Sequence, residues 1–97
     1  MDLRNLVWSK RAVEKFNRQM FWYKVNGLNT AAHSFMQNIQ ETVQTIQRMP
    51  AIGKIEKQTS RKIYASFPSH RLCRVYYWYD ETTVFIANLR FTKTEES

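Results

Sequence analysis

Cysteine, glycine and histidine are scarce in this chain, which has one cysteine, two glycines and two histidines in 97 residues. A single cysteine cannot form an intramolecular disulfide, and the sequence after Met1 lacks a signal-peptide apolar core, so we expect a cytoplasmic protein. The histidines, His33 and His70, are not spaced as zinc ligands. Gly27 and Gly53 form neither a phosphate-binding loop nor a dinucleotide fingerprint. We therefore expect no metal and no cofactor.

Acidic residues and long apolar runs are also few. Asp and Glu number 8 against 15 Lys and Arg, which gives a net charge of +7 at pH 7. No run of about 18 apolar residues exists, so we expect no membrane span. A hydrophobic content of 43% with 24% charged residues is typical of a globular protein. We predict one domain over residues 1–97, with 92–97 as a frayed tail, and a partner that carries negative charge.

The N-terminal part of the chain predicts a strand followed by a helix. Residues 3–8 are short and apolar, and the hydroxyl of Ser9 can accept a backbone N–H and so begin a helix. Apolar residues then recur at helical spacing along one stripe, namely Ala12, Phe16, Met20 and Tyr23. This helix should end near Gly27, because glycine tolerates the left-handed conformation at helix ends.

A second helix is the clearest element in the sequence. Asn29 or Thr30 can cap its start, and Pro50 should end it, because proline lacks the backbone donor that a helix needs. Its apolar residues step by three and four: Ala32, Phe35, Ile39, Val43, Ile46 and Met49. The two helices should form an antiparallel hairpin, and residues 51–60 read as a connecting loop.

The C-terminal third predicts three antiparallel strands, residues 61–67, 71–79 and 82–91. Period-two alternation gathers basic, aromatic and amide side chains on one face: Lys62, Tyr64, Ser66, Arg74, Tyr76, Trp78, Asn88 and Arg90. The opposite face is apolar: Ile63, Ala65, Phe67, Cys73, Val75, Tyr77, Phe85, Ala87 and Leu89. The same alternation leaves Val84 and Ile86 on the basic face, which favours covering of that part by a partner.

These elements predict an α+β fold in the order strand, helix, helix and three antiparallel strands. The helical hairpin should pack on one face of a small antiparallel sheet whose first strand is residues 3–8. Cys73 belongs to the apolar face, where a buried thiol is unreactive. Tyr76 and Trp78 have two interpretations that the sequence leaves open: they pack under a helix or a partner, or they stack on bases.

Several short motifs follow one another in a particular order along nearly the whole chain. The second helix opens with Ala-x-x-Phe (Ala32, Phe35) and ends at Pro-Ala-Ile-Gly (Pro50 to Gly53). The next strand begins with an arginine (Arg61). A Phe-Pro pair (Phe67-Pro68) follows, and then an Arg-Val-Tyr-Tyr run (Arg74 to Tyr77) before an aspartate turn (Asp80). In this order and spacing the chain resembles the RelE/ParE superfamily of bacterial toxins, the toxic halves of type II toxin–antitoxin pairs.

The resemblance implies one fold with two different activities. RelE-like toxins are metal-independent endoribonucleases (mRNA interferases) that cut messenger RNA in the ribosome, where cations stabilise the phosphorane charge. ParE-like toxins bind DNA gyrase and are not enzymes. The resemblance implies that the chain is the toxin of a type II toxin–antitoxin (plasmid-stabilisation) module and is neutralised by a cognate antitoxin. A third alternative is a partner-binding domain that has lost toxicity.

The residues that the resemblance assigns to catalysis form an incomplete set. Lys62 and Arg74 match the family's lysine and catalytic-face arginine, and Arg90 is the candidate for a C-terminal arginine. Tyr64 stands where the ribonucleases have a second lysine, and no tyrosine follows Lys93. These departures favour the ParE branch, with the ribonuclease as the alternative.

The predicted site therefore serves catalysis only in the ribonuclease branch, and otherwise nucleic-acid or partner binding. Its residues are Arg61, Lys62, Tyr64, Arg71, Arg74, Tyr76, Trp78, Arg90 and Lys93. The implied partners are an antitoxin together with DNA gyrase, or with the ribosome and its messenger RNA. A homodimer and a toxin–antitoxin hetero-oligomer are both left open.

Overall fold

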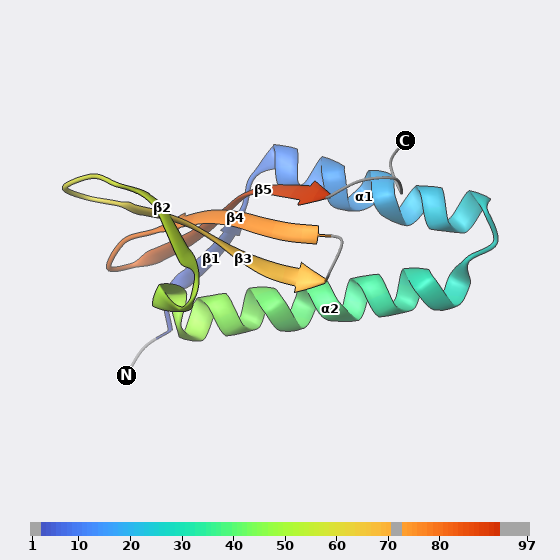
Figure 1. Ribbon diagram of the computed structural model, residues 1–97, viewed down its shortest axis with the longest axis horizontal. Coiled ribbons are helices and arrows are strands. Elements are labelled where there is room, and N and C mark those ends of the chain that lie inside the picture. The colour runs from blue at the N-terminus through green and yellow to red at the C-terminus, as the bar shows by residue number, and fades with distance from the viewer. Residues whose placement is uncertain (1–2, 71–72, 92–97) are drawn as a thin grey trace.

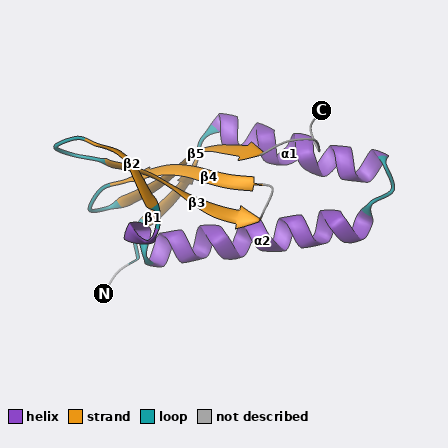
Figure 2. Cartoon of the chain, in the orientation of Figure 1, coloured by secondary structure: helices purple, strands orange, loops and turns teal. Residues whose placement is uncertain are grey.

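A computed structural model describes residues 3–70 and 73–91 of the chain. Two helices pack on a sheet in the expected α+β arrangement (Figure 1, Figure 2). The elements in chain order are β1 (Asn5–Trp8), α1 (Lys10–Val25), α2 (Asn29–Arg48), a short 3-10 helix η1 (Pro50–Ile52), β2 (Lys54–Gln58), β3 (Ile63–His70), β4 (Cys73–Tyr79) and β5 (Thr83–Phe91). The predictions for Arg71, Lys93 and the tail 92–97 lie outside the described residues.

The sheet of the described chain has five strands in the order β1-β5-β4-β3-β2. Strands β2 to β5 pair antiparallel, as expected for the last three, whereas β1 lies parallel to β5. The expectation of a wholly antiparallel sheet is therefore wrong. The direction of β1 follows from a pairing between the two ends of the chain, and its few residues carry no local signal of that direction.

The segment 51–60, expected to be a loop, contains η1 and strand β2. Every residue of β2 is exposed, so the strand lacks the apolar alternation that reveals a half-buried strand in sequence. It forms one edge of the sheet and pairs only with β3. Its lysines, Lys54 and Lys57, are typical of edge strands, because charge opposes pairing with other chains.

A β-bulge in β5 reverses part of the predicted alternation. Tyr76 pairs with Asn88 while the next residue, Tyr77, pairs with Ile86, so Ala87 is an extra residue. Val84 and Ile86 are consequently buried under the helices. Phe85 lies beside Trp78 on the other face, so the predicted faces of Val84, Ile86 and Phe85 are wrong.

The bulge is held by the start of α1. The Ser9 hydroxyl donates to the Ala87 carbonyl oxygen at 2.8 Å and accepts from the backbone N–H of Ala12 at 2.9 Å. Its own backbone N–H donates to the Ile86 carbonyl oxygen at 2.9 Å. The predicted cap is confirmed, and the same side chain ties the helix to the last strand.

The other helix boundaries agree with expectation except at the start of α2. Gly27 has a φ of +70° and follows the end of α1, as a helix-ending glycine does. The cap of α2 is Leu28, without a side-chain bond, so the predicted cap at Asn29 or Thr30 is wrong. Helix α2 ends at Arg48, just before Pro50.

The helical hairpin covers one face of the sheet, with α1 against β5 and α2 against β3. The buried core combines both helices with β3, β4 and β5: Ala12, Tyr23, Phe35, Ile39, Val43, Ile46, Ala65, Cys73, Val75, Tyr77, Tyr79, Val84, Ile86 and Leu89. The hairpin runs past the ends of β3, β4 and β5, so its far end stands clear of the sheet (Figure 1). In the described chain neither helix is long and apolar enough to cross a membrane.

Candidate functional site

The face of the sheet that the helices do not cover carries most of the predicted site, and we call it the open face. The strand register places its side chains in three rows across β3, β4 and β5. The first row is aromatic (Tyr64, Trp78 and Phe85). The second row is polar (Ser66, Tyr76 and Asn88). The third row is cationic through its two arginines (Pro68, Arg74 and Arg90). Rings and arginines thus gather at opposite ends of one surface.

At the aromatic end, rings and lysines contact one another. Trp78 and Phe85 stack with ring centroids 5.1 Å apart and an interplanar angle of 20°. The Lys62 ammonium lies 4.0 Å from the centroid of the Trp78 ring, and the Lys57 ammonium lies 5.7 Å from that of Tyr64. Contacts of this kind contribute about 0.5–1 kcal/mol at exposed sites, so they orient both lysines over the face.

At the cationic end, hydrogen bonds position Arg74. Its Nε donates to the Ser66 hydroxyl at 2.8 Å, and that hydroxyl donates to a Glu56 carboxylate oxygen at 2.5 Å. Ser66 is fully buried, so this relay is fixed within the sheet. The Arg90 guanidinium lies 5.6 Å from the centroid of the Tyr76 ring. The Ser66 hydroxyl thus links the Arg74 guanidinium to the Glu56 carboxylate, and Arg90 lies against a ring on the same face.

The turn before β3 sets the position of Lys62. The Thr59 hydroxyl accepts from the backbone N–H of Lys62 at 3.0 Å and from that of Arg61 at 3.3 Å. This side-chain turn closes the β2–β3 connection and starts β3 at a fixed residue. Lys62 lies two residues before Tyr64, so its side chain reaches the same face of the sheet as Tyr64.

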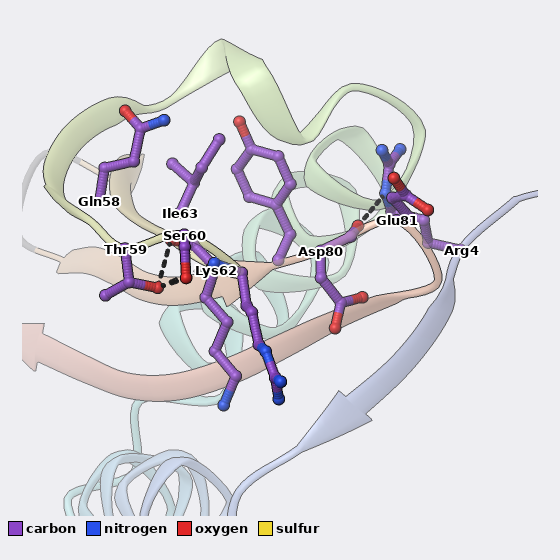
Figure 3. A pocket seen from close by; sticks show the side chains of 10 residues that line it. Arg4, Gln58, Thr59, Ser60, Lys62, Ile63, Asp80 and Glu81 are labelled. Atoms are coloured by element: carbon purple, nitrogen blue, oxygen red, sulfur yellow. Dashed lines mark hydrogen bonds between the residues drawn. The ribbon is translucent and has the colours of Figure 1, made fainter.

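A polar cavity of about 230 Å³ lies beside this turn, at the end of the sheet (Figure 3). Arg4 donates from Nε to the Asp80 carbonyl oxygen at 2.6 Å. Backbone N–H groups of Thr82 and then Thr83 donate to the Asp80 carboxylate and hold its pKa below the ordinary 3.8. Arg61 also lines this cavity rather than the open face. Charges of both signs lie around it, and these contacts stabilise the two turns.

The structure brings together six of the predicted site residues: Lys62, Tyr64, Arg74, Tyr76, Trp78 and Arg90. Sequence reasoning missed Phe85, because the bulge at Ala87 cannot be read from alternation. It also missed Glu56, which belongs to the strand taken for a loop. One signal pointed to Glu56, because it is the lone acidic residue among the basic residues from Lys54 to Trp78.

On the helical side, an apolar groove of about 460 Å³ lies between the two helices and β1. Its lining combines aliphatic, aromatic and amide side chains: Leu6, Trp8, Val13, Phe16, Ile39, Gln40, Val43 and Gln44. A second apolar surface lies at the far end of the hairpin, where Phe21, Val25 and Leu28 are 64%, 59% and 42% exposed. The described part of the chain thus offers these two apolar surfaces besides the basic open face.

The fold has known counterparts. A solved structure described as the chromosomal ParDE TA system from P. aeruginosa matches with a TM-score of 0.73 and 15% identity, over 94% of this chain and 98% of that chain. The YoeB dimer from Staphylococcus aureus matches with a TM-score of 0.59 and 19% identity, over 93% and 98%. The architecture matches that of these solved structures, so the predicted fold class is confirmed.

A family model described as the ParE toxin of the type II toxin–antitoxin system, parDE, matches residues 6–94. The chain belongs to this family of toxins, and the predicted RelE/ParE superfamily is thereby confirmed. A comparison with the sequences of curated proteins gave no match.

Proposed function

We propose that this protein inhibits growth by binding DNA gyrase, and that a cognate antitoxin neutralises it within a plasmid-stabilisation module. The observation that carries the proposal is the match of residues 6–94 to the ParE toxin family. The gyrase target is what the resemblance to ParE-like toxins implies. The cytoplasm, where gyrase acts, is then the expected location.

The far end of the helical hairpin suits a protein target. Phe21 and Val25 are one helical turn apart on α1, and Leu28 follows in the connection to α2. Large apolar side chains that cluster while exposed are typical of protein–protein contact surfaces. Because the hairpin extends beyond the sheet, a target can reach this surface while the open face stays accessible (Figure 1).

The groove between the helices suits the antitoxin. An amphipathic segment can bury its apolar side against Val13 and Phe16, while its acidic residues offset the net charge of +7. Val13 is 41% exposed in this groove, and Val7, outside it, is 42% exposed. Val13→Gln should weaken copurification with the antitoxin encoded beside this gene, whereas Val7→Gln should not. Equal binding by both variants would place the antitoxin elsewhere.

Gyrase supercoiling in the presence of the purified chain tests the target. The proposal predicts inhibited supercoiling or accumulated cleaved DNA. Phe21→Ser combined with Val25→Ser should relieve this inhibition, and Ile55→Ser, a change at an apolar residue 56% exposed on β2, should not. Unchanged gyrase turnover at saturating toxin would rule out this target.

Ribosome-dependent cleavage of messenger RNA is the second candidate, and the Glu56–Ser66–Arg74 relay favours it. A carboxylate can accept the ribose 2′-hydroxyl proton, and a neighbouring arginine can stabilise the phosphorane charge. The assay compares the wild type with Glu56→Gln, Lys62→Ala and Arg74→Ala on translating ribosomes. A toxic wild type that cuts no messenger RNA would exclude this function. Harmless expression without any antitoxin would instead favour a partner-binding domain that has lost toxicity.

A further inference from the structure

One side of helix α1 carries cations that belong neither to the open face nor to the apolar groove. Arg11, Lys15 and Arg18 are spaced by four and then three residues, so they lie along one side of the helix, and we call them the basic flank. Arg11 and Arg18 are exposed, and Lys15 is half-buried. The Lys15 ammonium donates to the Leu89 carbonyl oxygen at 3.2 Å, which holds the middle of the basic flank against β5.

Neighbouring carboxylates do not offset the charge of the basic flank. Glu14 is the one acidic residue of α1, and within the described part of the chain it forms no ion pair with the cations of this helix. The first turn of α1 contains Lys10 and Arg11 and has no acidic residue, although the positive end of the helix dipole lies there. Such a placement costs about 0.3–1 kcal/mol for each charge. Residues that break a local rule at a cost in stability are typical of binding surfaces.

The basic flank continues into the exposed apolar end of the hairpin. Helix α1 runs from β5 to that end (Figure 1). Val25 comes seven residues after Arg18, which brings it to the same side of the helix, and Phe21 comes one turn after Arg18. At about 1.5 Å per residue, Arg18 lies roughly 10 Å before Val25 along the helix axis, and Arg11 lies roughly 21 Å before it. A partner that contacts Phe21 and Val25 therefore faces the cations as well.

We propose that the basic flank contacts the phosphates of duplex DNA held by gyrase, while Phe21 and Val25 contact the enzyme itself. This contact rests on the proposed gyrase target and extends it, since the DNA becomes part of the surface that the toxin recognises. It requires no base recognition, because arginine and lysine bind the phosphates of any sequence. The residues involved all belong to α1, on the helical side of the molecule.

A phosphate backbone fits the basic flank better than an acidic protein surface does. The three cations span roughly 10 Å of a rigid helix, which is the length of about three nucleotides at about 3.4 Å per nucleotide of one strand. Two of them are exposed arginines, whose planar donor groups match phosphate oxygens in pairs. The core of a protein–protein interface, by contrast, is depleted of charged residues.

Binding of the full chain to purified gyrase, with and without a linear DNA duplex on the enzyme, tests the contact. The wild type should bind gyrase that holds DNA more tightly than gyrase alone. This difference should shrink by about 3.5-fold for each phosphate contact when salt is raised from about 50 to about 200 mM. Arg11→Gln and Arg18→Gln should each lower the slope of log K against log salt by about 0.9 for gyrase with DNA. Neither substitution should change binding to gyrase alone.

Two further substitutions serve as controls. Arg48→Gln removes the same charge from an exposed position in the last turn of α2, and it should leave the DNA-dependent difference nearly unchanged. Glu14→Gln removes the one carboxylate of α1 and should enlarge that difference. All of these positions are exposed, so the fold should be retained. Equal losses for Arg48→Gln and Arg11→Gln would mean nonspecific attraction to a basic protein and would overturn the proposal.

Gyrase without DNA separates this contact from the gyrase target itself. Wild-type binding that is equal with and without DNA would overturn the DNA contact and leave the target intact. Arg11→Gln and Arg18→Gln that weaken binding equally in both forms would also overturn it, because the basic flank would then contact an acidic surface of the enzyme. A wild type that binds neither form would refute the gyrase target and the DNA contact together.

Discussion

Replacing Tyr77 with phenylalanine removes one hydroxyl from the centre of the molecule and leaves the ring in place. Tyr77 is 1% exposed, and its hydroxyl donates to the Pro50 carbonyl oxygen at 2.6 Å. That bond fastens the segment after α2 to the middle strand of the sheet. Loss of the donor leaves a buried carbonyl without this partner, which costs about 1–3 kcal/mol.

Urea unfolding at about pH 8 measures this cost directly. Tyr77→Phe should lower the midpoint without changing the slope, because the compactness of both states is retained. The matched control is Tyr76→Phe, which removes a hydroxyl from the half-buried open face and should change stability by less than about 0.5 kcal/mol. Equal midpoints for Tyr77→Phe and the wild type would refute the structural role of this bond.

The same hydroxyl makes stability depend on alkaline pH. Burial raises the pKa of Tyr77 to about 12, against 10.0 for an ordinary tyrosine. The folded state therefore keeps a proton that the unfolded state loses, so the contribution is complete below pH 10.0 and declines as the pH rises towards about 12. The wild type should lose about 1.4 kcal/mol between pH 8 and pH 11 through this group. Tyr77→Phe should lack that loss, and parallel pH profiles for the two proteins would contradict the assignment.

Three further substitutions test local features of the fold. Gly53→Ala should destabilise by about 1–3 kcal/mol in urea, because the added carbon would lie 2.7 Å from the Ser66 carbonyl oxygen; an unchanged midpoint would contradict this. Ser9→Ala removes both the cap of α1 and the bond to Ala87, and should cost about 1–3 kcal/mol in thermal or urea unfolding. Asp80→Asn should lower stability near neutral pH, and the difference should shrink as the pH falls below 3.8, because the lowered pKa of Asp80 gives a contribution that is present above 3.8 and lost in acid. A difference that persists in acid would show that the carboxylate charge is not responsible.

Most of the fold could be predicted because its signals are local. The hydroxyl of Ser9, the positive φ of Gly27 and the ring of Pro50 each act within one helical turn, and each marks a boundary near where the structure has it. The apolar stripe of α2 is equally local. By contrast, the parallel pairing of β1 with β5 joins residues about 80 positions apart, and nothing in either strand alone encodes it.

The candidate site was predictable where strands are regular and not where they are interrupted. Alternation along β3 and β4 correctly grouped Tyr64, Arg74 and Trp78 on one face. It failed in β5 after one extra residue at Ala87, because a single insertion exchanges the two faces of everything on one side of it. Glu56 escaped for a different reason: an edge strand exposed on both faces leaves no apolar period in the sequence.

The bulge links the helical side of the molecule to the chemistry of the open face. Without the extra residue, Phe85 would lie under the helices, and Val84 and Ile86 would occupy the open face beside the lysines and arginines. The bonds from Ser9 to Ala87 and Ile86 select the bulged register, which buries the two aliphatic residues and brings Phe85 against Trp78. The cap of the first helix is therefore also a determinant of the aromatic row. A change at Ser9 that leaves the protein folded should alter tryptophan fluorescence through the Trp78–Phe85 stack, and an unchanged spectrum would show that the register is set by strand pairing alone.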